Sequence, residues 1–294
     1  MRNSARQPNR APFVRLLLAA ALLLAPALAP AAQKMTPEEV VKRHLDSLGT
    51  AEDRAAIKSR LMQGAAALVL RSPGAGRAQG PAMMFSEGDK SVIAMNFGSP
   101  DYPFDKFGFD GDKLTVAYQK PGVRSTLGDF IYNRDLIFKH GLMGGTLSST
   151  WPLLDFDGKE AKLEYNGTAK VNDRQAHRLR YAPRRGSDLK ITLYFDAENF
   201  RHLRTEYEQT VSNQMGGIST DRNLERELRY RLVEDFSDFK QEGKLTLPHT
   251  YKINLSLDRR TGGNYLAEWE LRFSQFGFNQ QLDPKWFDVT AASE

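Results

Sequence analysis

Histidine is the residue type that could most readily carry acid–base or metal chemistry in this sequence. A zinc site needs ligands at short, fixed spacings, as in the His-Glu-x-x-His helix, and no two histidines here have such a spacing. We therefore expect them to be packed or hydrogen-bonded rather than to bind a metal. The five histidines are His44, His140, His177, His202 and His249.

The other common catalytic patterns are also absent from the sequence. It contains no cysteine, which excludes disulfides, thiolate metal sites, cysteine nucleophiles and lipid-anchored cysteine. There is no Gly-x-Ser-x-Gly nucleophile elbow, and Gly74-Ala75-Gly76 lacks the lysine of a phosphate loop. Asp110-Gly111-Asp112 lacks the remaining ligands of a calcium loop and indicates a turn. We expect no catalytic residue, no metal and no cofactor.

The N-terminus has the pattern of a secretory signal peptide. Four arginines and no acidic residue precede an apolar run, Leu16–Leu24, that contains only Leu and Ala. Small residues at Ala29 and Ala31 then suit a cleavage site near Ala31. The run has about half of the ~20 residues that a membrane-spanning helix needs, so an uncleaved anchor is the alternative rather than the expectation. We predict that residues 1–31 are removed and that the mature protein is periplasmic, with no transmembrane segment.

Removal of this segment changes the charge of the protein. The whole chain has 41 basic and 36 acidic residues, a formal net charge of +5. Taking four arginines from the 41 leaves 37 basic residues against 36 acidic ones, or +1. A nearly neutral domain has no global electrostatic attraction for nucleic acid, so we expect no nucleic-acid partner.

The mature chain opens with helix signals. Thr36 suits the N-cap position, Pro37 the first helical position, and Glu39 could complete a capping box. Gly49 then ends the helix. A second short helical piece is expected over residues 51–59.

From there the apolar period falls to two, which predicts strands that each have one apolar and one polar face. Asp110-Gly111 between two such runs predicts a hairpin. About ten strands in succession favour one large curved sheet or an open barrel rather than βαβ units. The strands expected from this pattern contain Gln63–Arg71, Val92–Phe97, Phe107/Phe109, Leu114/Val116/Tyr118, Leu163/Tyr165, Leu179/Tyr181, Ile191/Leu193/Phe195, Leu228/Tyr230/Leu232, Tyr251/Ile253/Leu255/Leu257 and Ala267/Trp269/Leu271/Phe273.

One stretch, Ser125 to His140, interrupts the strands and is predicted to be a helix with one apolar side. This helix could be fixed core that plugs the barrel. It could also be a movable lid over an apolar cavity, with Gly141, Gly144 and Gly145 as hinges.

The order of these features resembles the outer-membrane lipoprotein carrier superfamily, whose members are LolA/LolB-like or lipoprotein-sorting proteins. Three stretches carry the resemblance. Phe109–Leu114 looks like the family's Asp-Gly hairpin, and Leu193–Phe200 followed by Leu203-Arg204 looks like its strand, Asp turn and strand. The end, from Asp235 through Leu247-Pro248-His249 to Phe278–Asp288, looks like its closing strands and terminal signature.

The resemblance implies a fold that is mainly β with a few α-helices. It is an incomplete antiparallel β-barrel of about ten to eleven strands, closed by helices on the concave side over an apolar cavity. In the family that cavity holds acyl chains, and we expect residues 32–294 to be a single monomeric domain of this kind. The candidate cavity and lid residues are Ile93, Met95, Leu127, Phe130, Ile131, Phe138, Leu142, Met143, Trp269 and Leu271.

The leading functional hypothesis is a periplasmic carrier or sensor. It would bind a lipoprotein acyl chain or another lipophilic ligand by apolar burial, without catalysis. The first alternative is an envelope protein–protein interaction module whose barrel is filled by its own side chains. The second is an enzyme with a site that none of these motifs describes.

Overall fold

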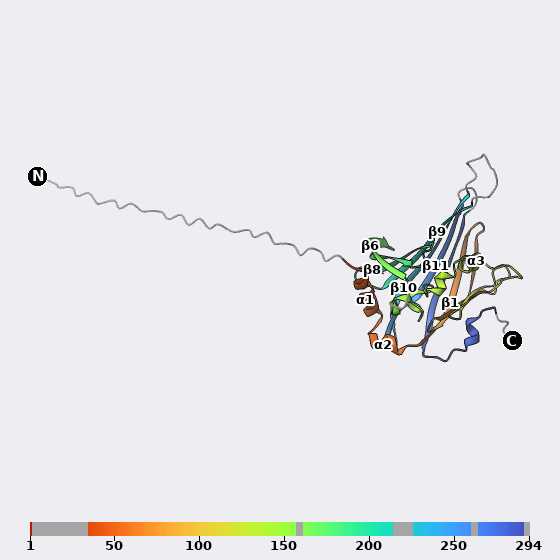
Figure 1. Cartoon of the computed structure of the whole chain (residues 1–294), viewed down its shortest axis with the longest axis horizontal. Helices are drawn as coiled ribbons and strands as arrows, with labels where there is room; N and C mark the ends of the chain where they lie inside the picture. The colour runs from red at the N-terminus through yellow and green to blue at the C-terminus, as the bar shows by residue number, and fades with distance from the viewer. Residues whose placement is uncertain (2–34, 157–160, 214–225, 260–263, 291–294) are drawn as a thin grey trace. The chain divides into compact units, whose positions relative to one another are not determined.

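The alternating side chains build one antiparallel sheet of twelve strands in the computed structural model (Figure 1). The structure describes residue 1 and residues 35–156, 161–213, 226–259 and 264–290, so the predicted signal peptide lies almost wholly outside the described residues. The strands are β1 Ser59–Ser72, β2 Gly76–Glu87, β3 Lys90–Asn96, β4 Phe104–Phe109, β5 Leu114–Val116, β6 Ala161–Val171, β7 Arg174–Pro183, β8 Lys190–Asp196, β9 His202–Asn213, β10 Arg226–Glu242, β11 Leu245–Arg259 and β12 Tyr265–Phe278.

The sheet is open. Its strand order is β5-β4-β3-β2-β1-β12-β11-β10-β9-β8-β7-β6, and the edge strands β5 and β6 do not pair with each other. All consecutive strands are neighbours except β5 and β6, and the two halves of the sheet join where β12 pairs with β1. This confirms the predicted fold class, an incomplete antiparallel barrel with few helices.

Two strands of the sheet, β2 and β9, were not predicted from the period-two pattern of apolar residues. β2 contains glycines and Pro81, which usually argue against an inner strand. Pairing between β2 and β3 begins at Ala82, and Gly80 allows the Asn96 carbonyl to come close, because a Cβ at Gly80 would lie 1.9 Å from that oxygen. β9 pairs with both β8 and β10 although it carries many charged side chains.

The first helix begins and ends as predicted. The side-chain oxygen of Thr36 accepts a hydrogen bond from the Glu39 N–H at 3.2 Å, and Gly49 follows the last helical residue. The Glu39 carboxylate pairs with Arg43 Nε at 2.6 Å. The second helix is shorter than predicted because β1 already begins at Ser59. The helices are α1 Pro37–Leu48, α2 Ala51–Ala56, α3 Thr126–Tyr132 and α4 Leu136–Lys139, with 3-10 turns η1 Gly145–Leu147, η2 Pro152–Asp155 and η3 Pro284–Phe287.

The predicted helix over residues 125–140 was wrong in one respect, because it is two short helices separated by a turn. The Asn133 side chain donates a hydrogen bond to the Asp129 carbonyl at 2.8 Å and so ends α3. The turn places Arg134 against aromatic rings, with its guanidinium carbon 4.2 Å from the Phe130 ring centre and 4.1 Å from that of Tyr230. We call residues 125–155 the middle segment.

Both faces of the sheet are covered in part. The main core lies between the sheet and a layer formed by α1 and the middle segment. The turn η3 packs on the opposite face, where Phe287 joins Phe85, Val92 and Leu282 in a small separate cluster. The helices therefore cover the concave side as predicted, apart from this C-terminal turn. Within the described residues, no helix has the length and apolar character needed to cross a bilayer.

Candidate functional site

The middle segment occupies the interior of the curved sheet. Every residue from Gly141 to Trp151 except Ser149 is buried. Much of this stretch lies outside α-helices, in turns and the short η1 helix. An interior filled by loop-like backbone needs partners for its polar groups, and the sheet supplies them.

The structure brings all ten candidate residues together. None is more than 2% exposed, and all belong to one continuous core. Ile93 and Met95 come from β3, and Trp269 and Leu271 from β12. The other six lie on the middle segment. Contact with a ligand stays a prediction for each of them.

Glu234 on β10 fixes the centre of the middle segment. Its carboxylate accepts hydrogen bonds from the Gly144 N–H at 2.7 Å, from the Tyr207 hydroxyl at 2.6 Å and from the Tyr251 hydroxyl at 2.5 Å. Glu234 is fully buried, and burial raises its pKa to about 7 although the three donors oppose the rise.

Asp105 on β4 fixes the start of the middle segment. Its carboxylate accepts hydrogen bonds from the Tyr102 hydroxyl at 2.7 Å, from Trp269 Nε1–H at 2.9 Å and from the Ser125 hydroxyl. Ser125 is also the N-cap of α3, where its oxygen accepts from the Gly128 N–H. Burial raises the pKa of Asp105 to about 7.

Arg60 on β1 fixes the end of η1. Its guanidinium donates to the carbonyl oxygens of Thr146 at 2.7 Å and Ser148 at 3.3 Å. Burial lowers the pKa of Arg60 to about 10, so the side chain remains a cation at neutral pH. In the described residues no carboxylate forms an ion pair with it. We call Glu234, Asp105 and Arg60, whose side chains are hydrogen-bonded to the middle segment, the three anchors.

Trp151, near the end of the middle segment, packs in a cluster with His44 and His202. Trp151 Nε1–H donates to His44 Nε2 at 3.2 Å, so His44 carries its proton on Nδ1 and donates to the Phe200 carbonyl at 3.0 Å. Burial lowers the pKa of His44 to about 4, in keeping with a neutral ring. His202 stacks on Trp151, with ring centres 4.6 Å apart. These two histidines are packed, as the sequence predicted.

The glycines of the middle segment pack closely against the sheet. Gly144 and Gly145 have positive φ angles of 79° and 48°. A Cβ at Gly145 would lie 2.7 Å from the His202 ring, and one at Gly144 would lie 2.2 Å from Met84 Cε. Their role as hinges stays a prediction, but both positions require glycine for conformation and space.

Sequence reasoning missed the three anchors. Each is a charged residue at a strand position that should be apolar. Glu234 lies between the buried residues Leu232 and Phe236 in the period-two pattern of β10. Asp105 lies on the same face of its strand as the buried Phe107, and Arg60 lies on the same face as the buried Met62. Both are therefore charged residues on an apolar face. A charged residue on the inward face of a strand was the signal that could have found them.

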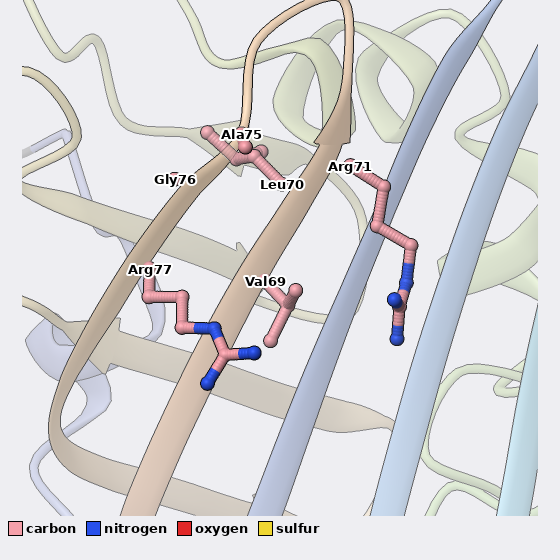
Figure 2. Close-up of a pocket in the computed structure, with 6 residues that line it drawn as sticks. All are labelled: Val69, Leu70, Arg71, Ala75, Gly76 and Arg77. Atoms are coloured by element: carbon pink, nitrogen blue, oxygen red, sulfur yellow. The ribbon is translucent and has the colours of Figure 1, made fainter.

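Two hollows formed by described residues lie away from these anchors. One, of about 320 Å³, is between α1 and β6 and is lined by Val41, Leu45, Phe156 and Leu163 among others. The other, of about 520 Å³, is at the β1–β2 hairpin and is lined by Val69, Leu70, Arg71, Ala75, Gly76 and Arg77 (Figure 2). In the described part of the chain, no group of three acidic or histidine side chains is placed to hold a metal ion.

Solved structures give the comparison with known proteins. No family model matches the sequence, and no curated protein matches it significantly. The structure resembles LolA superfamily proteins. One such protein from Nitrosomonas europaea is 14% identical, with 86% of this chain and 97% of that chain covered and a TM-score of 0.44. An outer-membrane lipoprotein-sorting protein domain from Vibrio parahaemolyticus is 15% identical, with 84% and 97% covered and a TM-score of 0.42.

A third solved structure is the MucA/MucB complex of Pseudomonas aeruginosa. It is 10% identical over 83% of this chain and 100% of that chain, with a TM-score of 0.23. The first two proteins belong to the group that the stretches around Asp110, Asp196 and Asp283 resemble in sequence. These likenesses are distant, so the function has to be inferred from this chain's own residues.

Proposed function

We propose that the protein is a periplasmic carrier or sensor that binds an acyl chain or another lipophilic group between the middle segment and the concave face of the sheet. One observation carries the proposal. The interior is filled by a turn-rich segment that is tied to the sheet by three polar anchors. Such a segment can leave as a unit when a ligand replaces its apolar contacts.

Free-energy magnitudes show what this exchange requires. An acyl chain gains about 0.8 kcal/mol for each buried methylene, so a chain of about 16 carbons gains on the order of 12 kcal/mol. The three anchors form four hydrogen bonds with the segment, and each hydrogen bond to a charged group contributes about 1.5 to 3 kcal/mol. The apolar side chains of the segment also lose burial when it leaves. The exchange therefore requires that the displaced segment regains water at its polar groups and keeps part of its apolar surface covered.

The compartment is inferred from the N-terminal pattern. Arginines, a short Leu/Ala run and small residues near Ala31 support export and cleavage. The mature domain would then meet lipids and lipoproteins in the periplasm. No catalytic step is included in the proposal.

The experiment is purification from a cell envelope, lipid mass spectrometry of the extract and titration with a fluorescent fatty acid. The Phe130→Asp variant places a charge in the interior and should abolish probe binding. Ser274→Asp is the matched control, because it adds the same charge at an exposed position on β12, away from the middle segment. Near-UV circular dichroism shows whether each variant is folded. If Phe130→Asp does not fold, Phe130→Ala tests the same position and should alter the affinity for the probe.

An envelope interaction module is the second candidate, because a specific observation favours it. All ten candidate residues are packed in one core, as expected for a barrel filled by its own side chains. If no lipid co-purifies and the fatty acid does not bind, the carrier proposal is wrong and this second function gains support.

A further inference from the structure

One end of the sheet has a charge and a surface that cargo binding does not explain. Strand directions alternate, so the β1–β2 turn and the loop that follows β5 lie at the same end. We define the rim as residues 71–77 and 117–125, together with Tyr132 at the end of α3. Neither stretch contains an acidic residue, and together they carry four cations: Arg71, Arg77, Lys120 and Arg124.

Arg124 is held by aromatic rings. Its guanidinium carbon lies 4.2 Å from the centre of the Tyr118 ring and 3.8 Å from that of the Tyr132 ring. It also donates to the Tyr118 hydroxyl at 2.7 Å. The rings are 46% and 48% exposed, so two amphipathic side chains stand at the surface with a cation between them.

A tight turn projects beside this cluster. The backbone of Lys120 and Val123 forms an isolated bridge, and Pro121 and Gly122 occupy the turn between them. Lys120, Pro121 and Gly122 are exposed, and Val123 is 54% exposed. The turn thus presents an apolar side chain and a cation together.

The β1–β2 hairpin adds two cations. Figure 2 shows Arg71 and Arg77 on either side of Val69, around the hollow of about 520 Å³. Within the described chain, none of the four rim cations forms an ion pair with a carboxylate. Two acidic residues lie close by in the sequence, Asp101 in the β3–β4 loop and Asp129 on α3.

The opposite end of the sheet has a different character. The β4–β5 turn there contains Asp110, Asp112 and Lys113, and the β2–β3 turn contains Asp89. Trp286, on η3, is 55% exposed and is packed on strands near this end. The rim and the β4–β5 and β2–β3 turns therefore differ in charge rather than in the mere presence of exposed aromatic side chains nearby.

We propose that the rim docks on a membrane surface that carries anionic headgroups. Tyrosine is enriched at the membrane interface, and an exposed valine with neighbouring cations suits shallow insertion next to acidic lipids. Anionic headgroups would neutralise cations that have no carboxylate of their own. The proposal does not rest on cargo binding: the rim shares only Ser125 and Tyr132 with the middle segment, and the two residues changed in the test below, Lys120 and Val123, lie outside that segment.

The test is flotation of the purified protein with phosphatidylcholine vesicles that contain about 30 mol% phosphatidylglycerol, against phosphatidylcholine alone. The full coding sequence is expressed, and mass spectrometry verifies that all variants have the same N-terminus. The double variant Lys120→Glu/Val123→Ser should bind the anionic vesicles about tenfold more weakly. The matched control, Lys113→Glu/Trp286→Ser, removes a lysine and an exposed apolar side chain from the other end and should stay within about twofold of wild type.

Binding of the wild type should also fall when salt is raised from about 0.05 M to about 0.5 M. Equal loss of binding in the two double variants, equal binding to both kinds of vesicle, or no vesicle binding would each overturn the proposal. So would a rim that is buried in a dimer at the concentrations used, which light scattering detects. Fatty-acid titration without vesicles reports on cargo binding separately, so the failure of one proposal can be told from the failure of the other.

Discussion

Glu234 Oε1 accepts a hydrogen bond of 2.7 Å from the backbone N–H of Gly144. The bond joins the middle of β10 to the interior segment, across 90 residues of sequence. The same carboxylate holds Tyr207 and Tyr251, so one buried acid links the segment to three neighbouring strands. Its removal should therefore affect stability, pH dependence and ligand access together.

Glu234→Gln should lower the free energy of unfolding by about 2 kcal/mol at pH about 8, where the carboxylate is ionised. Glutamine has one acceptor oxygen for three donors, and its NH2 group must face one of them. Urea denaturation measures the change. Glu164→Gln removes an exposed ion pair with Arg180 and should change stability by less than about 0.5 kcal/mol. Equal stability of Glu234→Gln and wild type would show that the anchor contributes little.

The pH dependence of Glu234→Gln follows from the raised pKa. Between its usual 4.5 and about 7, the native carboxyl holds a proton that the unfolded chain has released. The part of the stability that comes from this pKa shift is therefore complete below about pH 4.5 and is lost as the pH rises to about 7, whereas the hydrogen bonds to the ionised carboxylate remain at pH about 8. On acidification from about pH 7, the free energy of unfolding of wild type should rise relative to that of Glu234→Gln by up to about 1.4 kcal/mol per pH unit.

Urea midpoints over this range test the prediction. Asp105→Asn should show the same sign, because burial also raises the pKa of Asp105 to about 7. A gap between wild type and Glu234→Gln that narrows on acidification would contradict the direction of the shift.

The sequence predicted the sheet well because strand faces are encoded locally. Each inward position in β8, in residues 251–257 of β11 and in residues 265–273 of β12 is apolar, so the period of two is visible within a few residues. β2 was missed because Gly80 is needed for the close approach of the Asn96 carbonyl at the end of β3, and this contact depends on pairing with another strand. The break at Asn133 was missed for a similar reason, since Arg134 turns toward Tyr230, nearly 100 residues away.

The site was predicted in part. The ten apolar candidates do converge, because amphipathic patterns fix which side chains face inward. The anchors were not predicted, because a charged residue within a strand is read as solvated unless its parity is checked. Arg60 and Glu234 lie on the same strand faces as their buried apolar neighbours. Their hydrogen bonds to the backbone of the middle segment, which is distant in the sequence, explain why a charge is present there.

Gly145→Ala should destabilise the protein by about 3 kcal/mol or more. The residue has a φ of 48°, and its Cβ would lie 2.7 Å from the His202 ring and 2.8 Å from Phe236. Gly186→Ala is the control, because that glycine has a φ of 75° but no atom within 4 Å of the added Cβ. It isolates backbone strain and should cost only about 1 to 2 kcal/mol. Equal costs in urea denaturation would mean that close packing at Gly145 is unimportant.

Glu234→Gln should also change ligand binding if the middle segment leaves the interior when an acyl chain enters. The free energy needed to displace the segment lowers the apparent affinity of the protein for the acyl chain, and a weaker anchor makes that free energy smaller. A loss of about 2 kcal/mol at the anchor should thus raise the affinity for a fluorescent fatty acid about thirtyfold. Stopped-flow mixing should show faster binding as well. If Glu234→Gln lowers stability but leaves the affinity and the rate unchanged, the segment does not move on binding. Any acyl chain would then have to bind elsewhere, with the interior acting as fixed core.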